Sequence, residues 1–224
     1  MVGIVGGLYF FVSQIAASVL ILGNAMASGG KGNGHHLILG MTIVFQGLFF
    51  VWLTHFIFKN WHGRPAMEYF RIRAAPIHLI LASAAGAVVL IPFFSAITEF
   101  FLRLFPVLRD LKFDGDGLLQ AKRPWEWVFM ILAIGVTPAV CEEFLFRGYF
   151  QRTLERTLRA PMLYLVSGTI FALIHQNYFG LIQLTLVGIY LGFVYHRAGS
   201  LLASGAAHFS YNTALVIFVN TPAS

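Results

Sequence analysis

The chain has few charged residues and a single cysteine, and both shortages exclude broad classes of protein. Asp, Glu, Lys and Arg make up 11% of its 224 residues, against roughly 25% in soluble domains. The one thiol, Cys141, cannot form an internal disulfide or supply a cysteine-rich zinc site. Two catalytic signatures are also missing, namely the His-Glu-x-x-His pattern of one class of zinc protease and a serine in a Gly-x-Ser-x-Gly turn.

The chain is instead rich in long apolar segments. Hydrophobic residues make up 58% of it and its mean hydropathy is +0.76, so we expect an all-α, multi-pass membrane protein with a single membrane domain over residues 1–224. The net charge of +6 then indicates membrane lipids as partners, and nucleic acid is not expected. About seven spanning helices are predicted, over residues 2–26, 37–58, 76–101, 124–158, 161–176, 178–195 and 200–219.

The distribution of Lys and Arg predicts how the chain is oriented. Loops on one side of the predicted helices hold nine of the 15 Lys and Arg residues, and cytoplasmic loops usually carry this excess. The N-terminus and the short turn at residues 159–161 are therefore expected in the cytoplasm. The sequence Ala25-Met26-Ala27 resembles a signal-peptidase site, but no Lys or Arg precedes the apolar run. This favours a retained first helix.

Three of the predicted helices carry polar residues at positions where membrane helices normally have none. A charged group at the bilayer centre costs about 3 kcal/mol even on insertion scales, so such groups usually face a partner or a watery cavity. The residues are Glu142, Glu143 and Arg147 in the fourth segment, His175 in the fifth, and His208 and Asn212 in the seventh.

Helical spacing gives the two adjacent carboxylates different expected tasks. Glu143 and Arg147 are four residues apart and share a helix face, where they can pair. This pairing leaves Glu142 free to accept a proton, although Arg147 could instead serve Glu142 through a bent helix. Pro138, four residues before Glu142, removes a backbone donor and predicts a kink there.

Residue counts from the connecting turns predict that the polar groups lie at similar depths. Counted from the turn between their helices, Glu142 and His175 differ by only ~4–5 Å in depth at 1.5 Å per residue. Counted from the start of the seventh segment, Asn212 approaches the level of His175, and His208 lies about one turn nearer the cytoplasm. We therefore expect these side chains to converge.

Such a set of side chains supports hydrolysis without a metal. Glu142 would take a proton from water, His175 would help to polarise that water, and Asn212 with His208 would donate to the developing oxyanion. Three alternatives remain open. One is a zinc protease that uses Glu142, His175 and His208 as ligands. The others are a catalytically silent scaffold or immunity-type protein and a proton-coupled transporter, which the absence of an internal repeat disfavours.

Three motifs, in this order, resemble the CAAX-protease and bacteriocin-processing family, which includes the type II CAAX prenyl endopeptidases. They are Glu142-Glu143-x-x-x-Arg147, Phe171-x-x-x-His175 and His208-x-x-x-Asn212. The resemblance covers residues 124–219, a protease-like core, and leaves the N-terminal helices of residues 1–123 without an assigned role. It implies a membrane-embedded bundle with a four-helix catalytic core and a cavity open to the cytosol.

The resemblance also implies an activity, that of a glutamic-type intramembrane endopeptidase. Glu142 and His175 would activate the water, and His208 and Asn212 would form the oxyanion hole. Glu143 and Arg147 would hold this set in place. The implied substrate is a membrane-associated or lipid-modified peptide or protein, no cofactor is expected, and the oligomeric state is left open.

Overall fold

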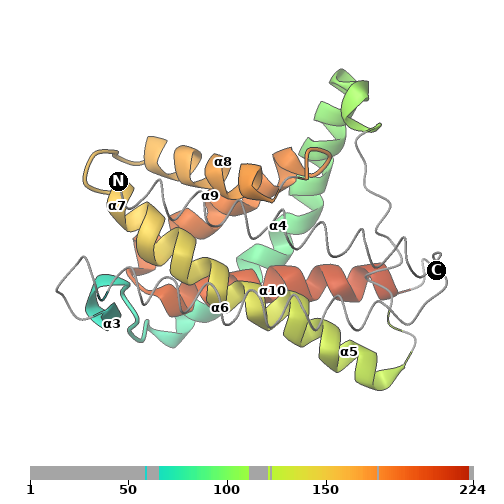
Figure 1. Ribbon diagram of the computed structural model, residues 1–224. Helices are drawn as coiled ribbons and strands as arrows, with labels where there is room; N and C mark the ends of the chain where they lie inside the picture. The colour runs from blue at the N-terminus through green and yellow to red at the C-terminus, as the bar shows by residue number, and fades with distance from the viewer. Residues whose placement is uncertain (1–58, 60–65, 111–120, 122, 176, 222–224) are drawn as a thin grey trace.

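The computed structural model describes residues 59, 66–110, 121, 123–175 and 177–221, and every element in these ranges is helical (Figure 1). The all-α class is therefore confirmed for these residues, whereas the predicted helices at 2–26 and 37–58 lie outside them. The helices are α3 (Ala66–Tyr69), α4 (Ile77–Leu104), the 3-10 helix η1 (Pro106–Leu108), α5 (Pro124–Met130), the π-helix η3 (Ile131–Val136), α6 (Thr137–Glu143), the π-helix η4 (Phe144–Gln151), α7 (Arg152–Leu154), α8 (Met162–Ile174), α9 (Leu181–Ala198) and α10 (Leu201–Asn220).

Four helices in the described part of the chain are long and apolar enough to cross a membrane. One of them is the continuous run of α5, η3, α6, η4 and α7, and the other three are α4, α9 and α10. The sequence predicted five spans in this part of the chain. The difference is α8, whose 13 residues fall short of the roughly 20 that a spanning helix needs.

Helix α10 lies at the centre of this arrangement. It contacts α4, α9, α6 and η3, while α8 and α9 pack against each other as a hairpin (Figure 1). One apolar core joins α4, α9 and α10, and its members are Ala87, Ile91, Phe94, Val187, Leu191, Ala207 and Tyr211. α10 is thus held from several sides, which fixes the position of the polar residues that it carries.

The α8–α9 hairpin depends on two glycines that let the helix backbones approach closely. A Cβ added at Gly188 would lie 2.7 Å from the Cα of Gly168, and one added at Gly168 would lie 2.6 Å from the backbone nitrogen of Ile189. These obstacles are backbone atoms, which cannot move aside as a side chain can. Close packing of small residues is a usual way for membrane helices to associate.

We expect Gly168→Ala to lower the stability of the protein by about 1–3 kcal/mol, as overpacking typically does. The measurement is the thermal unfolding midpoint in detergent. Gly205→Ala is the matched control, because its added methyl group would meet nothing closer than the Ala139 carbonyl oxygen at 3.4 Å. Equal midpoints for the two variants would contradict the close packing of the hairpin.

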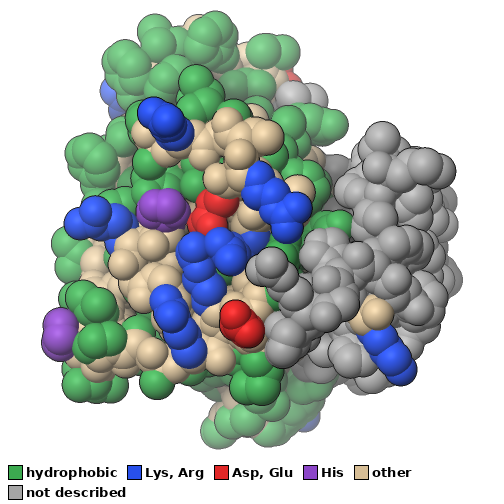
Figure 2. Space-filling model, turned by 90° about the vertical axis from the view of Figure 1, so that its left-hand side faces the viewer, with side chains coloured by type: hydrophobic (Ala, Val, Ile, Leu, Met, Phe, Trp, Pro, Cys, Tyr) green, Lys and Arg blue, Asp and Glu red, His purple; other side chains and the backbone are tan. Residues whose placement is uncertain are grey.

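A network of ion pairs ties together one end of the helices. Arg71 contacts both carboxylate oxygens of Glu155, at 3.2 and 3.0 Å. Arg152 and His196 reach the same carboxylate, at 2.6 and 3.2 Å. Figure 2 shows Lys and Arg side chains gathered on this end of the molecule. The ends of α7 and α9 are thereby held against the segment after α3.

Candidate active site

The helix that carries both carboxylates contains π-helical turns on either side of them. η3 precedes α6 and η4 follows it, and π-helical turns inside α-helices frequently occur at functional sites. Pro138 explains part of this, because it lacks the N–H group that would bond the Ile134 carbonyl in an α-helix. The side-chain amide of Asn212 donates to that carbonyl instead, at 2.8 Å. Pro138 itself lies at the start of α6, and the π-helical stretch η3 ends just before it. The Asn212 amide replaces the donor that Pro138 lacks.

Glu142 lies in a buried position between two imidazole rings. Its Oε2 atom is 3.6 Å from the Nε2 atom of His175 and 4.0 Å from the Nε2 atom of His208. Only 8% of the Glu142 side chain is exposed, and this oxygen accepts no hydrogen bond from the described residues. A buried carboxylate oxygen normally has a partner, and Glu142 Oε2 has no hydrogen-bond partner among the described residues.

The second nitrogen of each imidazole ring has a partner that determines where its proton lies. His175 Nδ1 is 2.7 Å from the Phe171 carbonyl oxygen, which can only accept, so Nδ1 carries the proton. In neutral His175, Nε2 is therefore an acceptor that faces Glu142. His208 Nδ1 lies 3.0 Å from Glu143 Oε1 and donates to that carboxylate.

Glu143 and Arg147 form the buried pair that their spacing predicts. Arg147 Nη1 is 3.2 Å from Glu143 Oε1, and both side chains are almost wholly buried. This contact is an ion pair without the alignment of a hydrogen bond. Neither Nη1 nor Nε of Arg147 has a hydrogen-bond acceptor among the described residues. Nη2 donates to the Gly188 carbonyl at 3.2 Å. Arg147 thus joins the carboxylate helix to α9.

Phe171 packs against three of the predicted site residues. Its ring centroid is 4.5 Å from that of His175 and 5.9 Å from that of His208. The guanidinium carbon of Arg147 lies 4.7 Å from the same centroid, in cation–π contact. The motif that contains Phe171 pointed to this ring, whereas a backbone contact such as the Gly188 carbonyl leaves no signal in a sequence.

The structure brings five of the six predicted side chains into one connected group and places the sixth beside it. The contacts run from His175 through Glu142 to His208, and from His208 through Glu143 to Arg147. Asn212 points its amide nitrogen at the Ile134 carbonyl. The depth count was therefore wrong about α10, because His208 and not Asn212 is level with His175.

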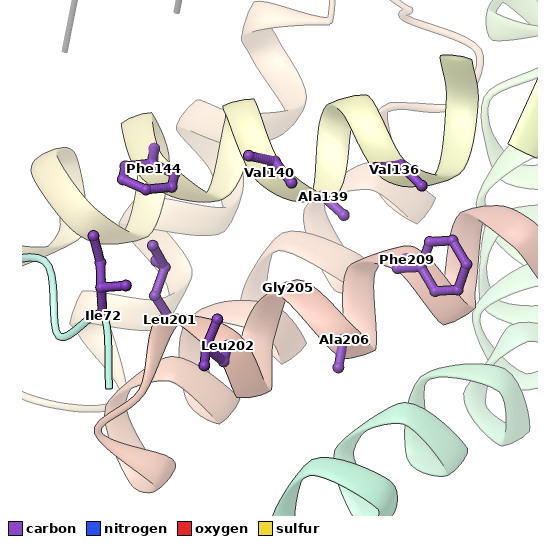
Figure 3. Close-up of a pocket in the computed structure, with 10 residues that line it drawn as sticks. All are labelled: Ile72, Val136, Ala139, Val140, Phe144, Leu201, Leu202, Gly205, Ala206 and Phe209. Carbon is purple, nitrogen blue, oxygen red and sulfur yellow. The ribbon is translucent and has the colours of Figure 1, made fainter. Parts of the chain in front are cut away.

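An apolar groove runs along the seam between α6, η4 and α10 (Figure 3). Its volume is about 300 Å³, and none of the six predicted site residues lines it. Val140 and Ala206 in its wall come two positions before Glu142 and His208 respectively. Its lining is completed by Ile72, Val136, Ala139, Phe144, Leu201, Leu202, Gly205 and Phe209.

Comparison with known proteins agrees with the motifs. Residues 124–214 match the family described as type II CAAX prenyl endopeptidase Rce1-like. The matched range contains all three motifs and most of the helices α5 to α10. No curated protein and no solved structure matches the chain. The family resemblance drawn from the motifs is confirmed, and it supports a membrane protease of the CAAX type in general.

Within the described residues, no group of three His, Cys, Asp or Glu side chains is arranged to hold a metal ion.

Proposed function

We propose that this chain is a membrane protease of the CAAX type and, more specifically, a glutamic endopeptidase that works inside the membrane. The observation that carries the proposal is the position of Glu142, whose buried Oε2 accepts no hydrogen bond among the described residues and faces the Nε2 atoms of two imidazoles. A general base needs a group that can take a proton and a geometry that brings water to it. Glu142 meets both requirements.

His175 and Glu142 together suit the activation of one water molecule. Both present acceptor atoms, 3.6 Å apart, so a water that donates one proton to each would keep a lone pair for attack on a peptide carbonyl. As the new C–O bond forms, Glu142 takes the proton from the water. It then passes this proton to the leaving amine nitrogen when the C–N bond breaks, which returns the carboxylate to its starting state.

His208 and Asn212 would stabilise the oxyanion of the tetrahedral intermediate. His208 Nδ1 donates to Glu143, and a proton on Nε2 would give His208 a second N–H directed at the oxyanion. An amide group has two N–H donors, and Asn212 uses one on Ile134, which leaves the other for the oxyanion. Donors of this kind commonly supply a large share of the rate enhancement in acyl transfer.

A membrane-associated or lipid-modified peptide is the substrate that suits this site. The groove of Figure 3 offers an apolar surface beside the helix that carries Glu142. The Arg-rich end of Figure 2 faces the cytoplasm if the positive-inside rule holds. The site would then open toward that side.

The proposal is tested by comparing the membrane-protein termini of cells that carry the wild-type chain or Glu142→Gln. We expect at least one peptide terminus that depends on Glu142. Glu126→Gln is the matched control, because Glu126 lies on the same helix and caps Arg123, a task that Gln also performs. Identical termini in all three strains, together with a retained cellular phenotype in Glu142→Gln, would favour the scaffold alternative and overturn the protease.

Metal dependence is tested separately. We expect full activity after extensive dialysis against a chelator such as EDTA, because the proposed chemistry draws its base and its oxyanion donors from side chains. The measurement is cleavage of a fluorogenic, prenylated CAAX peptide, or of a terminus found in the cellular comparison. Loss of activity on chelation, restored by Zn²⁺, would replace the glutamic mechanism with the zinc alternative.

A further inference from the structure

Gln151 is a fully buried polar side chain that the proposed chemistry does not use. Its Nε2 donates to the Gly192 carbonyl on α9 at 2.9 Å. Its Oε1 accepts from the Ser167 hydroxyl on α8 at 3.4 Å. One amide therefore bonds both helices of the α8–α9 hairpin. This hairpin faces the helix Pro124–Leu154, called the catalytic helix below because it carries Glu142.

These bonds are the last rung of a regular ladder between the catalytic helix and α8. Glu142 faces His175, Arg147 lies against Phe171, and Gln151 meets Ser167. The two helices are antiparallel. The three residues on the catalytic helix are five and four positions apart, and their partners on and just after α8 are four positions apart. The first rung contains the proposed base, and the third contains an amide and a hydroxyl that bond each other.

A second set of rungs joins the catalytic helix to α9. Arg147 donates to the Gly188 carbonyl and Gln151 to the Gly192 carbonyl, so both pairs are 41 positions apart in the sequence. The glycines make room for this approach, since a Cβ at Gly192 would lie 2.9 Å from Gln151 Oε1. The two glycines of Gly188-x-x-x-Gly192 therefore allow close packing, and their carbonyls also accept hydrogen bonds from the catalytic helix.

The ion pair with Glu143 and the cation–π contact with Phe171 hold Arg147 in the site, but few directional bonds fix the orientation of its guanidinium. Its single well-formed hydrogen bond among the described residues is the one to Gly188, while Nε and Nη1 have no acceptor there. A small rotation of η4 would move the guanidinium away from that carbonyl. Glu143 would move with it, and so would the partner of His208 Nδ1.

We infer that Gln151, seated between Gly192 and Ser167, is a positioning residue for the active site. It locks the rotation of η4 against α8 and α9, and so keeps Arg147, Glu143 and His208 in register. The inference rests on the proposed function, because it concerns the geometry of the same site. Gln151 itself touches neither the substrate nor the attacking water.

The test replaces Gln151 by Met, which has a similar shape and cannot make either bond. With a prenylated CAAX peptide as the probe, we expect kcat to fall about tenfold or more while KM stays within about threefold, as small misplacements of catalytic groups cause. In a Glu143→Gln background, the same change should cost less than about twofold, since residues that act as one unit are not additive. Additive losses, or a change confined to KM, would overturn the inference.

Tyr190→Phe is the matched control. It removes another bond from α9 to a backbone carbonyl, that of Tyr190 to Ser83 at 2.7 Å, outside the ladder. We expect its kcat to stay within about twofold of wild type. If Gln151→Met does not fold, Gly192→Ala provides the second variant, because its methyl group displaces the Gln151 amide without removing it. Unchanged kcat in that variant would equally contradict the inference.

A measurement without substrate separates this inference from the proposed function. Solid-state NMR of ¹⁵N-labelled histidine, with His208 assigned by His208→Gln, reports whether Nδ1 carries the proton. We expect the Nδ1–H signal of His208 in the wild type and its loss or shift in Gln151→Met, with no change in Tyr190→Phe. An inactive Glu142→Gln with an unchanged His208 signal in Gln151→Met would leave the protease standing and remove the role of Gln151.

Discussion

Replacing Glu142 by Gln is expected to lower kcat by about 10³- to 10⁴-fold, or ~4–5 kcal/mol in the barrier. The amide has the shape of the carboxylate, so the buried position between His175 and His208 stays filled. It cannot take a proton from water at neutral pH. The measurement is the single-turnover rate on the prenylated CAAX peptide, with the thermal unfolding midpoint as the check on folding.

Two controls make that result specific. Glu126→Gln changes a carboxylate on the same helix and should leave the rate unchanged. His175→Gln removes the second acceptor for the water. It should lower the single-turnover rate nearly as much as Glu142→Gln does, because the two residues act on one water molecule. A Glu142→Gln enzyme that keeps more than about a tenth of the wild-type rate would contradict the role of Glu142 as general base.

Arg147→Met should produce the largest loss of stability of any single change in the site, about 3–5 kcal/mol. The substitution removes the cation from a wholly buried pair and, among the described residues, leaves His208 as the remaining side-chain partner of the Glu143 carboxylate. Adding Glu143→Gln to Arg147→Met should recover much of the loss, because no unbalanced charge then remains buried. Unfolding in detergent, followed by intrinsic fluorescence, measures both changes.

The chain supplies a surface pair of the same spacing and length as the control. Arg103 and Glu99 are also four residues apart and 3.2 Å from each other, with 75% and 43% of their side chains exposed. Arg103→Met should cost no more than about 1 kcal/mol, as exposed pairs do. If Arg103→Met and Arg147→Met are equally destabilising, burial does not explain the contribution of the Glu143–Arg147 pair to stability.

Much of this site could be predicted from residue spacing, because helices repeat regularly. The distance of four between Glu143 and Arg147 predicted their pairing, and the three motifs identified every side chain of the connected group. Counting residues from the turn also placed Glu142 near His175. That count works for two antiparallel helices joined by a short turn, where both helices start at the same level.

The same count failed for His208, and the reason is geometric. It assumed that α10 runs parallel to its neighbours and that every residue rises 1.5 Å. The count measured His175 from the turn before α8 and His208 from the turn before α10, and the sequence does not place these two turns at one depth. An error of one helical turn follows easily.

Backbone partners were also beyond the reach of the sequence. The carbonyls of Gly188 and Gly192 hold Arg147 and Gln151, and a glycine in a sequence does not indicate which side chain its carbonyl will accept from. Gln151 did leave a signal, because it lies four residues after Arg147 as Arg147 lies four after Glu143. A polar residue that continues a catalytic stripe along an apolar helix is a reasonable candidate for a supporting role.

The short length of α8 bears on how a substrate reaches the site. Its 13 residues rise about 20 Å, whereas the hydrocarbon layer is about 30 Å thick. Irregular backbone exposed to lipid is not tolerated at that depth, so the turn after His175 must meet water, headgroups or another part of the protein. Where headgroups of the opposite leaflet dip to meet it, the membrane is thinned beside Glu142 on the side away from the Arg-rich end. Water would then reach the carboxylate from that side, while the peptide enters from the Arg-rich end.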